Sequence, residues 1–334
     1  MRRAAQAAGL LAVGLLAGCG RYRDFTMPEQ PGGPDVQWHW QARADPVMPR
    51  GGTGDWDAVD VLNPSVIRQG DAYYNFYSGF DGKAWHTGLA VSPDGIAWHK
   101  EGRILSPESG TWEGNLIAAN GSAIVDESGI LYYYQAGEGE RVEIGLARSR
   151  NGHQWQRNGA PVLTVGPWGN WDERGVADPY VIRVASNYYM FYLGQDRARR
   201  QRIGVAMSRD GVAWQKLRSN PILALGDYGA FDANGLGEPA VWASRGYYWM
   251  LYTGRDRDEV RRLGLARSRD GVRWEKVPST VIAGSAAWDS KVICDPTVIA
   301  NGDHVTVWFG GGDVARPDQN LHGQIGVGTL TVAK

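Results

Sequence analysis

Short runs of apolar residues, each bounded by turn residues, make up most of this chain. The stretch Trp171–Gly194 shows the pattern, because an aromatic residue, an acid and a polar loop lead into an apolar run that begins at Asp178-Pro179. Tyr180–Val184 and Tyr188–Leu193 then predict two strands joined by a turn. Proline has no N–H to donate, so Pro179 suits the first position of a strand. Asp178 is therefore expected where a loop meets that strand.

The same pattern recurs every 56 to 60 residues. Each repeat opens with an aromatic residue followed by an acid, at Trp56, Trp112, Trp171, Phe231 and Trp288. A strand-start position follows in each repeat, occupied by Asn63, Asn120, Asp178, Glu238 and Asp295. In the first four repeats, an aromatic strand, a third strand ending in Asp-Gly or Asn-Gly, and a fourth strand marked by tryptophan complete the unit. Five such repeats predict an all-β fold, a five-bladed β-propeller of four-stranded blades.

The fifth repeat contains only three of the four strands, the last of them at Gln324–Val332. We expect Val36–Trp40 to supply the missing outer strand, so that the N-terminal strand closes the ring and removes its exposed edges. The propeller domain is accordingly expected to span residues 35–334.

The first residues have the character of an export signal. Two arginines, an apolar stretch and small residues occupy positions 1–18, and Leu16–Cys19 resembles the lipobox of bacterial lipoproteins. This predicts a signal peptide at 1–18, lipidation of Cys19 and a flexible lipidated tether at 19–34. The alternative is an ordinary signal peptide that contains a cysteine. We expect an exported lipoprotein on the periplasmic face or the cell surface, with the lipid as its contact with the membrane and with Cys294 as its remaining thiol.

Charge and composition exclude several classes of protein. The net charge is −1 over 334 residues, with both signs interspersed, so no basic face for nucleic acid is expected. The six histidines are scattered, and neither zinc-like spacing nor a glycine-rich phosphate loop is found. We therefore expect a monomer without a metal ion or a cofactor.

In a propeller the five strand-start residues converge on one end of the channel, which brings three carboxyl groups together. Mutual repulsion should raise the pKa of at least one of them. A protonated carboxyl beside an ionised one is what cleavage of a glycosidic bond requires. The alternative is that Asp-Pro and Glu-Pro only begin strands.

The repeat resembles the five-bladed glycoside hydrolases of families 43, 62 and 32 over nearly the whole chain after Val36. The resemblance implies that Glu238 is the general acid and that Asp178 positions the substrate and tunes a pKa. It also implies an aspartate as catalytic base at the start of the first blade, where this chain has Asn63. The remaining candidates for the base are Asp295, at its own strand start, and Asp60, which lies in the same loop as Asn63.

These observations predict a glycosidase that cleaves a furanoside or related oligosaccharide, with inverting stereochemistry. Two alternatives remain: a non-catalytic carbohydrate-binding lipoprotein, and a glycoside phosphorylase similar to the family 130 mannoside phosphorylases. Besides the catalytic candidates, residues expected to contact the saccharide are Asn63, Asn120, Trp85, Trp168, Arg174 and Arg255. The two tryptophans are chosen because an apolar ring can stack on a sugar, although packing of loops explains them equally well.

Overall fold

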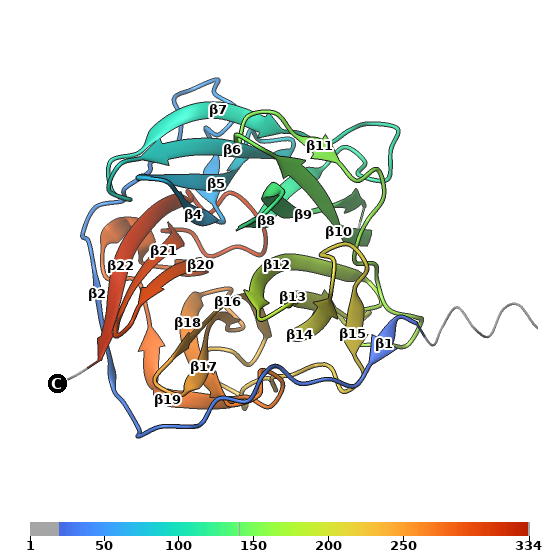
Figure 1. Cartoon of the computed structure of the whole chain (residues 1–334). Coiled ribbons are helices and arrows are strands. Elements are labelled where there is room, and N and C mark those ends of the chain that lie inside the picture. Colours follow the sequence, from blue (N-terminus) through green and yellow to red (C-terminus); the bar gives the residue numbers. More distant parts are fainter. Residues whose placement is uncertain (1–19, 140, 333–334) are drawn as a thin grey trace, which may run out of the picture.

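The computed structural model describes residues 20–139 and 141–332, and almost all of its regular structure is β-strand (Figure 1). Within these residues the helical content is one short 3-10 helix, η1 (Ala287–Asp289). The described residues contain no helix with the length and apolar character needed to span a membrane. The predicted signal peptide and Cys19 lie outside the described residues. The all-β prediction is confirmed.

Neighbouring strands pair antiparallel in consecutive groups, and the groups are arranged around a common centre (Figure 1). The first group contains β3 (Asp60–Leu62), β4 (Val66–Gln69), β5 (Ala72–Phe80), β6 (Trp85–Ser92) and β7 (His99–Leu105). The second contains β8 (Ile117–Asp126), β9 (Gly129–Glu138), β10 (Arg141–Ser149) and β11 (Gln156–Arg157). The third contains β12 (Gly175–Val184), β13 (Asn187–Gln195), β14 (Gln201–Ser208) and β15 (Gln215–Leu217).

The fourth group contains β16 (Gly235–Ser244), β17 (Tyr247–Arg255), β18 (Arg261–Ser268) and β19 (Glu275–Ile282). The last contains β20 (Val292–Asn301), β21 (His304–Gly312) and β22 (Gln324–Val332). The outer partner of β22 is β2 (Trp38–Ala42), which comes from the N-terminal part of the chain and pairs antiparallel from Trp38 opposite Val332. The strand expected at Val36–Trp40 is thus present two residues later and beside the predicted partner.

The hydrophobic core lies between neighbouring groups. Phe76 and Tyr132 pack the first group on the second, with 5.7 Å between ring centroids. Phe191 and Met250 belong to the cluster between the third and fourth groups. Each sheet therefore buries both of its faces against its two neighbours, which explains why the strands read as nearly continuous apolar runs.

In the first four repeats, the acid that follows the aromatic residue anchors its group. Asp172, fully buried, accepts hydrogen bonds from Tyr192 Oη at 3.2 Å and Lys216 Nζ at 2.5 Å. Asp232 accepts equivalent bonds from Tyr252 Oη and Lys276 Nζ. These acids are satisfied by a tyrosine of the second strand and a cation of the fourth, so the repeat marker has a structural role.

The segment expected to be a flexible tether packs against the domain in its described part. β1 (Tyr22–Arg23) pairs parallel with β15, and the Met27 side chain is only 1% exposed in the core between the third and fourth groups. The N–H of Met27 donates to the carbonyl of Asp270 at 2.8 Å. Residues 20–34 are thus part of the folded body, because they bury apolar side chains and form backbone hydrogen bonds with it.

Candidate active site

The five strand-start residues share one unusual backbone conformation. All have a positive φ between 44° and 51°, at Asn63, Asn120, Asp178, Glu238 and Asp295. Strand pairing slips at the same points, for example between Ala177 and Tyr180 on β12. These local bulges redirect one side chain in each group, and all five residues line a single cavity of about 30 Å³.

Backbone preference explains four of these residues but not Glu238. Asparagine and aspartate adopt the left-handed conformation more readily than other residues that carry a side chain. Glutamate has no such advantage, and the left-handed conformation costs it about 1–2 kcal/mol. A strained residue that carries a carboxyl group into a central cavity favours a functional role for Glu238.

Asn120 positions Asp178. Its Nδ2 donates to Asp178 Oδ1 at 3.2 Å, and its Oδ1 accepts from Ser78 Oγ at 2.9 Å. Ser78 also accepts from the N–H of Asn120, so the amide is held with its NH₂ group toward Asp178. The structure therefore makes Asn120 a partner of a carboxyl group, where the sequence predicted a contact with the saccharide.

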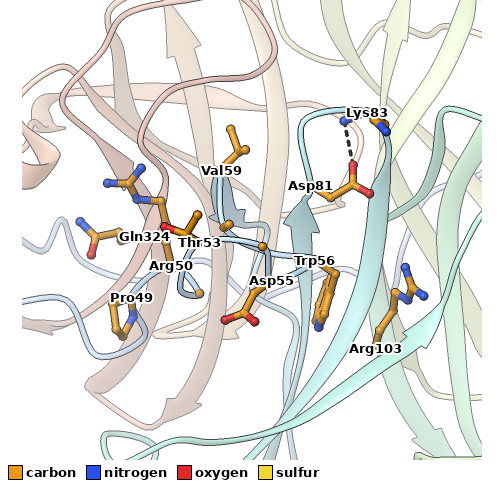
Figure 2. Close-up of a pocket in the computed structure, with 13 residues that line it drawn as sticks. Pro49, Arg50, Thr53, Asp55, Trp56, Val59, Asp81, Lys83, Arg103 and Gln324 are labelled. Carbon is orange, nitrogen blue, oxygen red and sulfur yellow. Dashed lines mark hydrogen bonds between the residues drawn. The ribbon is translucent and has the colours of Figure 1, made fainter.

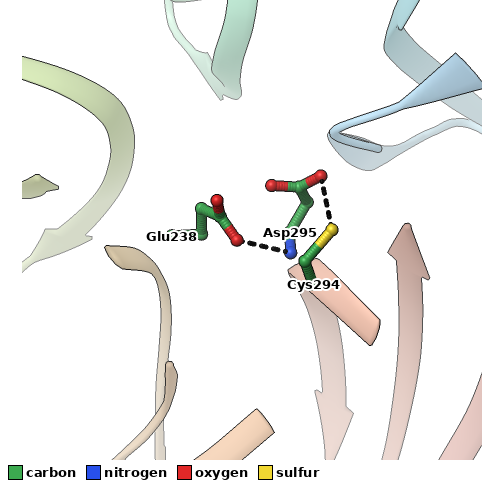
Figure 3. A group of neighbouring side chains, drawn as sticks. All are labelled: Glu238, Cys294 and Asp295. Atoms are coloured by element: carbon green, nitrogen blue, oxygen red, sulfur yellow. Dashed lines mark hydrogen bonds between the residues drawn. The ribbon is translucent and has the colours of Figure 1, made fainter. Parts of the chain in front are cut away.

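Glu238, Cys294 and Asp295 form a tight cluster (Figure 3). A ligand atom from each lies within 4.8 Å of the others. Glu238 Oε2 accepts from the N–H of Asp295 at 3.2 Å, while Asp295 Oδ2 accepts from Cys294 Sγ at 3.1 Å and from the N–H of Asn63 at 3.3 Å. These donors occupy part of the lone pairs that a metal ion would use.

Arg261, at the start of β18, is a member of this site that the sequence did not reveal. Its side chain is buried, and its Nη2 donates to the carbonyls of Arg316 and Pro317. Burial disfavours the charge of Arg261, but Glu238, Cys294 and Asp295 outweigh that effect and raise its pKa. A cation is thus already supplied by the protein, so this cluster fits a charge-compensated carboxyl site better than a metal site.

Two of the carboxyl groups retain protons at unusually high pH. Burial, followed by the charge of Glu238, raises the pKa of Asp178 to about 8, against the opposing effects of the Asn120 hydrogen bond and Arg261. Burial and the charges of Glu238 and Asp178 raise the pKa of Asp295 well above its usual range. The raised pKa predicted for this cluster follows from the repulsion that the sequence suggested, with burial as the larger cause.

Asp60 is buried and accepts hydrogen bonds from the backbone of a loop. Its Oδ2 accepts from the N–H of Asn320 at 2.6 Å, and its Oδ1 accepts from the N–H groups of Leu321 and Gly323 at 3.0 and 2.8 Å. It is not among the residues that line the central cavity. A carboxylate with three backbone donors anchors the loop between β21 and β22, so the structure does not support Asp60 as a base that reaches into the cavity.

The other residues predicted to contact the saccharide lie in different environments. Trp85 is buried and stacks on Phe80 with 4.9 Å between ring centroids, so it is a core residue and offers no face to a sugar. Arg255 is paired with Glu259 at 3.2 Å, and Arg174 lies directly before β12. Trp168, in contrast, is 81% exposed.

A larger hollow lies on the rim of the first group (Figure 2). Its volume is about 920 Å³, and charged residues on its walls include Arg50, Asp55, Asp81, Lys83 and Arg103. The turn at Asp81 follows β5, whose last residue pairs with the first residue of β3, so the hollow opens at the same end of the molecule as the strand starts. None of the five strand-start residues lines it.

The chain is similar in sequence to several known proteins. The family model described as "beta-1,4-mannooligosaccharide phosphorylase" matches residues 119–228, a region that includes Asn120 and Asp178. A 1,2-beta-oligomannan phosphorylase of Thermoanaerobacter sp. (strain X514) is 26% identical over 303 residues, covering 80% of this chain and 92% of that protein. The uncharacterized protein MT1551 of Mycobacterium tuberculosis (strain CDC 1551 / Oshkosh) is 28% identical over 229 residues, or 64% of this chain and 75% of its own length.

Solved structures show the fold. A beta-1,2-mannobiose phosphorylase from Listeria innocua superposes with a TM-score of 0.69 at 10% identity, covering 88% of this chain and 97% of that chain. Structures of glycoside hydrolases of families 43, 32 and 117 superpose with TM-scores of 0.59, 0.62 and 0.69, at 16%, 15% and 16% identity. The chain therefore has the fold of the propeller-type glycoside hydrolases and phosphorylases, and the predicted resemblance is confirmed at that level.

Proposed function

We propose that this protein cleaves an O-glycosidic bond of an oligosaccharide at the end of the channel where the strands start. In this proposal the strand groups are the blades of a five-bladed propeller, closed by the pairing of β2 with β22. The observation that carries the proposal is the set of equivalent, left-handed residues around one cavity, three of which are carboxyl groups beside the buried Arg261.

Glu238 is the proton donor in this proposal. Its charge contributes to the raised pKa of both Asp178 and Asp295. The proton passes from Glu238 to the glycosidic oxygen as the bond to the anomeric carbon breaks, and a nucleophile adds to that carbon. Asp178, whose pKa is raised to about 8, can resupply the proton at neutral pH.

The separation of the carboxyl groups bears on which nucleophile attacks the anomeric carbon. Inverting hydrolysis requires the acid and the base to be about 6.5–9.5 Å apart, so that a water molecule fits between them. Glu238 and Asp295 approach within 4.8 Å, Asp60 is occupied by backbone donors, and Asn63 is an amide. Asp295 is therefore better placed to interact with the carboxyl group of Glu238 than to act as a base on water.

Phosphorolysis is the second candidate, and the same observation favours it. Phosphate is itself a nucleophile at neutral pH and needs no protein base. Similarity to a 1,2-beta-oligomannan phosphorylase and to the mannooligosaccharide phosphorylase family model supports a mannoside as substrate. The furanoside expected from the sequence remains the alternative substrate.

One experiment separates these functions. The protein is incubated with β-1,2- and β-1,4-mannooligosaccharides and with arabino- and xylo-oligosaccharides, with and without inorganic phosphate, beside the Glu238→Gln variant. Sugar 1-phosphate formed only with phosphate identifies a phosphorylase, and reducing sugar formed without phosphate identifies a hydrolase. If every saccharide is bound and none is cleaved, the protein is a carbohydrate-binding lipoprotein and the proposed catalysis is wrong.

We also propose that the protein is exported and anchored through a lipid on Cys19. The sequence Leu16–Cys19 supports this proposal. Labelling with radioactive palmitate, compared between the natural protein and Cys19→Ala, tests it, and equal labelling of both would contradict it.

A further inference from the structure

Two aromatic side chains stand in solvent at the rim of the molecule. Trp168 is 81% exposed and Tyr228 is 83% exposed. In residues 20–139 and 141–332, every other tryptophan, tyrosine and phenylalanine is buried or half-buried. Single exposed rings are common on protein surfaces, so an argument for a binding role has to come from their positions.

The two rings occupy equivalent positions in neighbouring repeats. Each lies three residues before the aromatic residue that opens its repeat, and each is followed by a glycine with a φ of 86° or 87°. An arginine covers each ring at 4.4 Å from the ring centroid, Arg197 over Trp168 and Arg257 over Tyr228. The other three repeats have Thr53, Ser109 and Ser285 at this position. The fold therefore does not need an aromatic residue there.

Strand register places both rings at the end that carries the acids. Gly175, which begins β12, pairs with Gln195, which ends β13, so the turn that carries Arg197 adjoins the start of β12. Asp178 lies three residues further along, about 10 Å at the usual rise of a strand. The pairing of Gly235 with Arg255 puts Arg257 in the same relation to Glu238.

The surroundings of these rings suit a saccharide. Arg197 also donates to Glu173 at 3.0 Å, so charged hydrogen-bonding groups adjoin the Trp168 ring. A sugar presents apolar C–H faces and hydroxyl edges, which match an aromatic ring bordered by polar groups. A protein partner would favour a continuous apolar patch, whereas each of these rings is covered by an arginine side chain.

We propose that Trp168 and Tyr228 form a distal saccharide-binding surface, which holds sugar units of a long chain outside the bond that is cleaved. This inference rests on the proposed function, since it assigns the length of substrate that the site at Glu238 receives. It predicts that the protein distinguishes long from short chains through two rings that do not touch the reacting bond.

The test compares chain lengths in binding and in turnover. Titration calorimetry on Trp168→Ala, Tyr228→Ala and the double variant uses β-1,2- and β-1,4-mannohexaose and the corresponding mannobioses. We expect each single change to raise the Kd for a hexaose about threefold to tenfold, and the double change to raise it further, with the Kd for a biose unchanged. Trp168→Tyr should retain most of the affinity, and Ile96→Ala, at the opposite end, should behave as the natural protein.

The outcomes distinguish this inference from the proposed function. Kd values for hexaose that are unaffected by the double variant, or that rise equally for hexaose and biose, overturn the distal surface. Loss of turnover in Glu238→Gln with the hexaose preference intact supports both proposals. A hexaose preference that depends on both rings, in a protein that cleaves nothing, supports the surface and overturns the catalysis. Failure of the natural protein to bind either hexaose overturns the surface for mannosides.

Discussion

The carboxyl group of Glu238 accepts a hydrogen bond from the backbone N–H of Asp295 at 3.2 Å. The two acids come from the inner strands β16 and β20, and Glu238 is, after burial, the largest cause of the raised pKa of Asp295. The protonation of one group therefore depends on the charge of the other. A change at Glu238 should alter chemistry and titration together while leaving the backbone contact possible, because an amide oxygen can accept the same hydrogen bond.

Glu238→Gln should abolish turnover without unfolding the protein. Loss of a general acid lowers kcat by about 10²- to 10⁴-fold. The unfolding temperature should fall modestly at most, because the removed charge repels Asp178 and Asp295 but also compensates the buried Arg261. Initial rates and thermal unfolding measure both effects, with Glu275→Gln, at an exposed surface position, as the matched control. Unfolding of the variant at ordinary temperature would contradict a catalytic role.

Asp178→Asn should change how stability depends on pH. The pKa of Asp178 is about 8 in the folded protein and 3.8 for the free side chain, so the folded state binds more protons between these values. The free energy of unfolding contributed by Asp178 therefore decreases as pH rises from about 4 to 8. Asparagine does not titrate, and it tolerates the left-handed backbone. The variant should unfold at a higher temperature than the natural protein at pH 9, and the difference should shrink toward pH 4. A difference that is independent of pH would show that the raised pKa is wrong.

Arg261→Met should destabilise the protein most strongly at high pH. Removal of one partner from a buried group of charges costs about 3–5 kcal/mol. Without the cation, the carboxyl groups around it are harder to ionise, so acidification should restore part of the lost stability. Denaturant unfolding at pH 5 and pH 8 checks this, with Arg261→Lys as the variant that keeps the charge. Equal losses at both pH values would mean that Arg261 contributes packing alone.

Asp60→Asn tests whether this buried acid anchors a loop or acts on the substrate. Its carboxylate accepts from three backbone N–H groups, and the amide nitrogen of asparagine cannot accept. We expect a loss of about 1–3 kcal/mol of stability and faster hydrogen exchange at Asn320 and Leu321. A large fall in kcat with unchanged exchange would instead identify Asp60 as a catalytic base.

The N-terminal segment should be needed for stability. A chain that begins at Asp35 lacks β1 and Met27, and should unfold several degrees below a chain that begins at Gly20. Met27→Ala alone should cost about 2–5 kcal/mol, as expected for a buried methionine. The matched control is Thr26→Ala, at the exposed neighbouring position. Equal unfolding temperatures for the two chain lengths would support the prediction that this segment is a flexible tether.

The features that could be predicted from the sequence are those that recur in every repeat. The strand-start residues and the aromatic strands recur at equivalent positions, so the repeat alone is enough to place them around one cavity. Arg261 could not be found in this way, because the equivalent strand position in other repeats is held by Gln201 or Val142, and neither suggests a charge partner. Trp85 and Asp60 were misjudged because the sequence placed them in loops, whereas the structure places them in the strands β6 and β3.

The pairing of Trp38 with Val332 joins the first strand of the last group to the final residues described. During synthesis β2 leaves the ribosome before any other part of that group and has no partner until β22 has been made. Contacts between such distant segments form slowly, and unpaired edges promote association between molecules. A chain that ends before Gln324 would lack β22 and expose β2 and β21 at once. Assembly of the last group therefore depends on two strands that lie almost 300 residues apart in the chain.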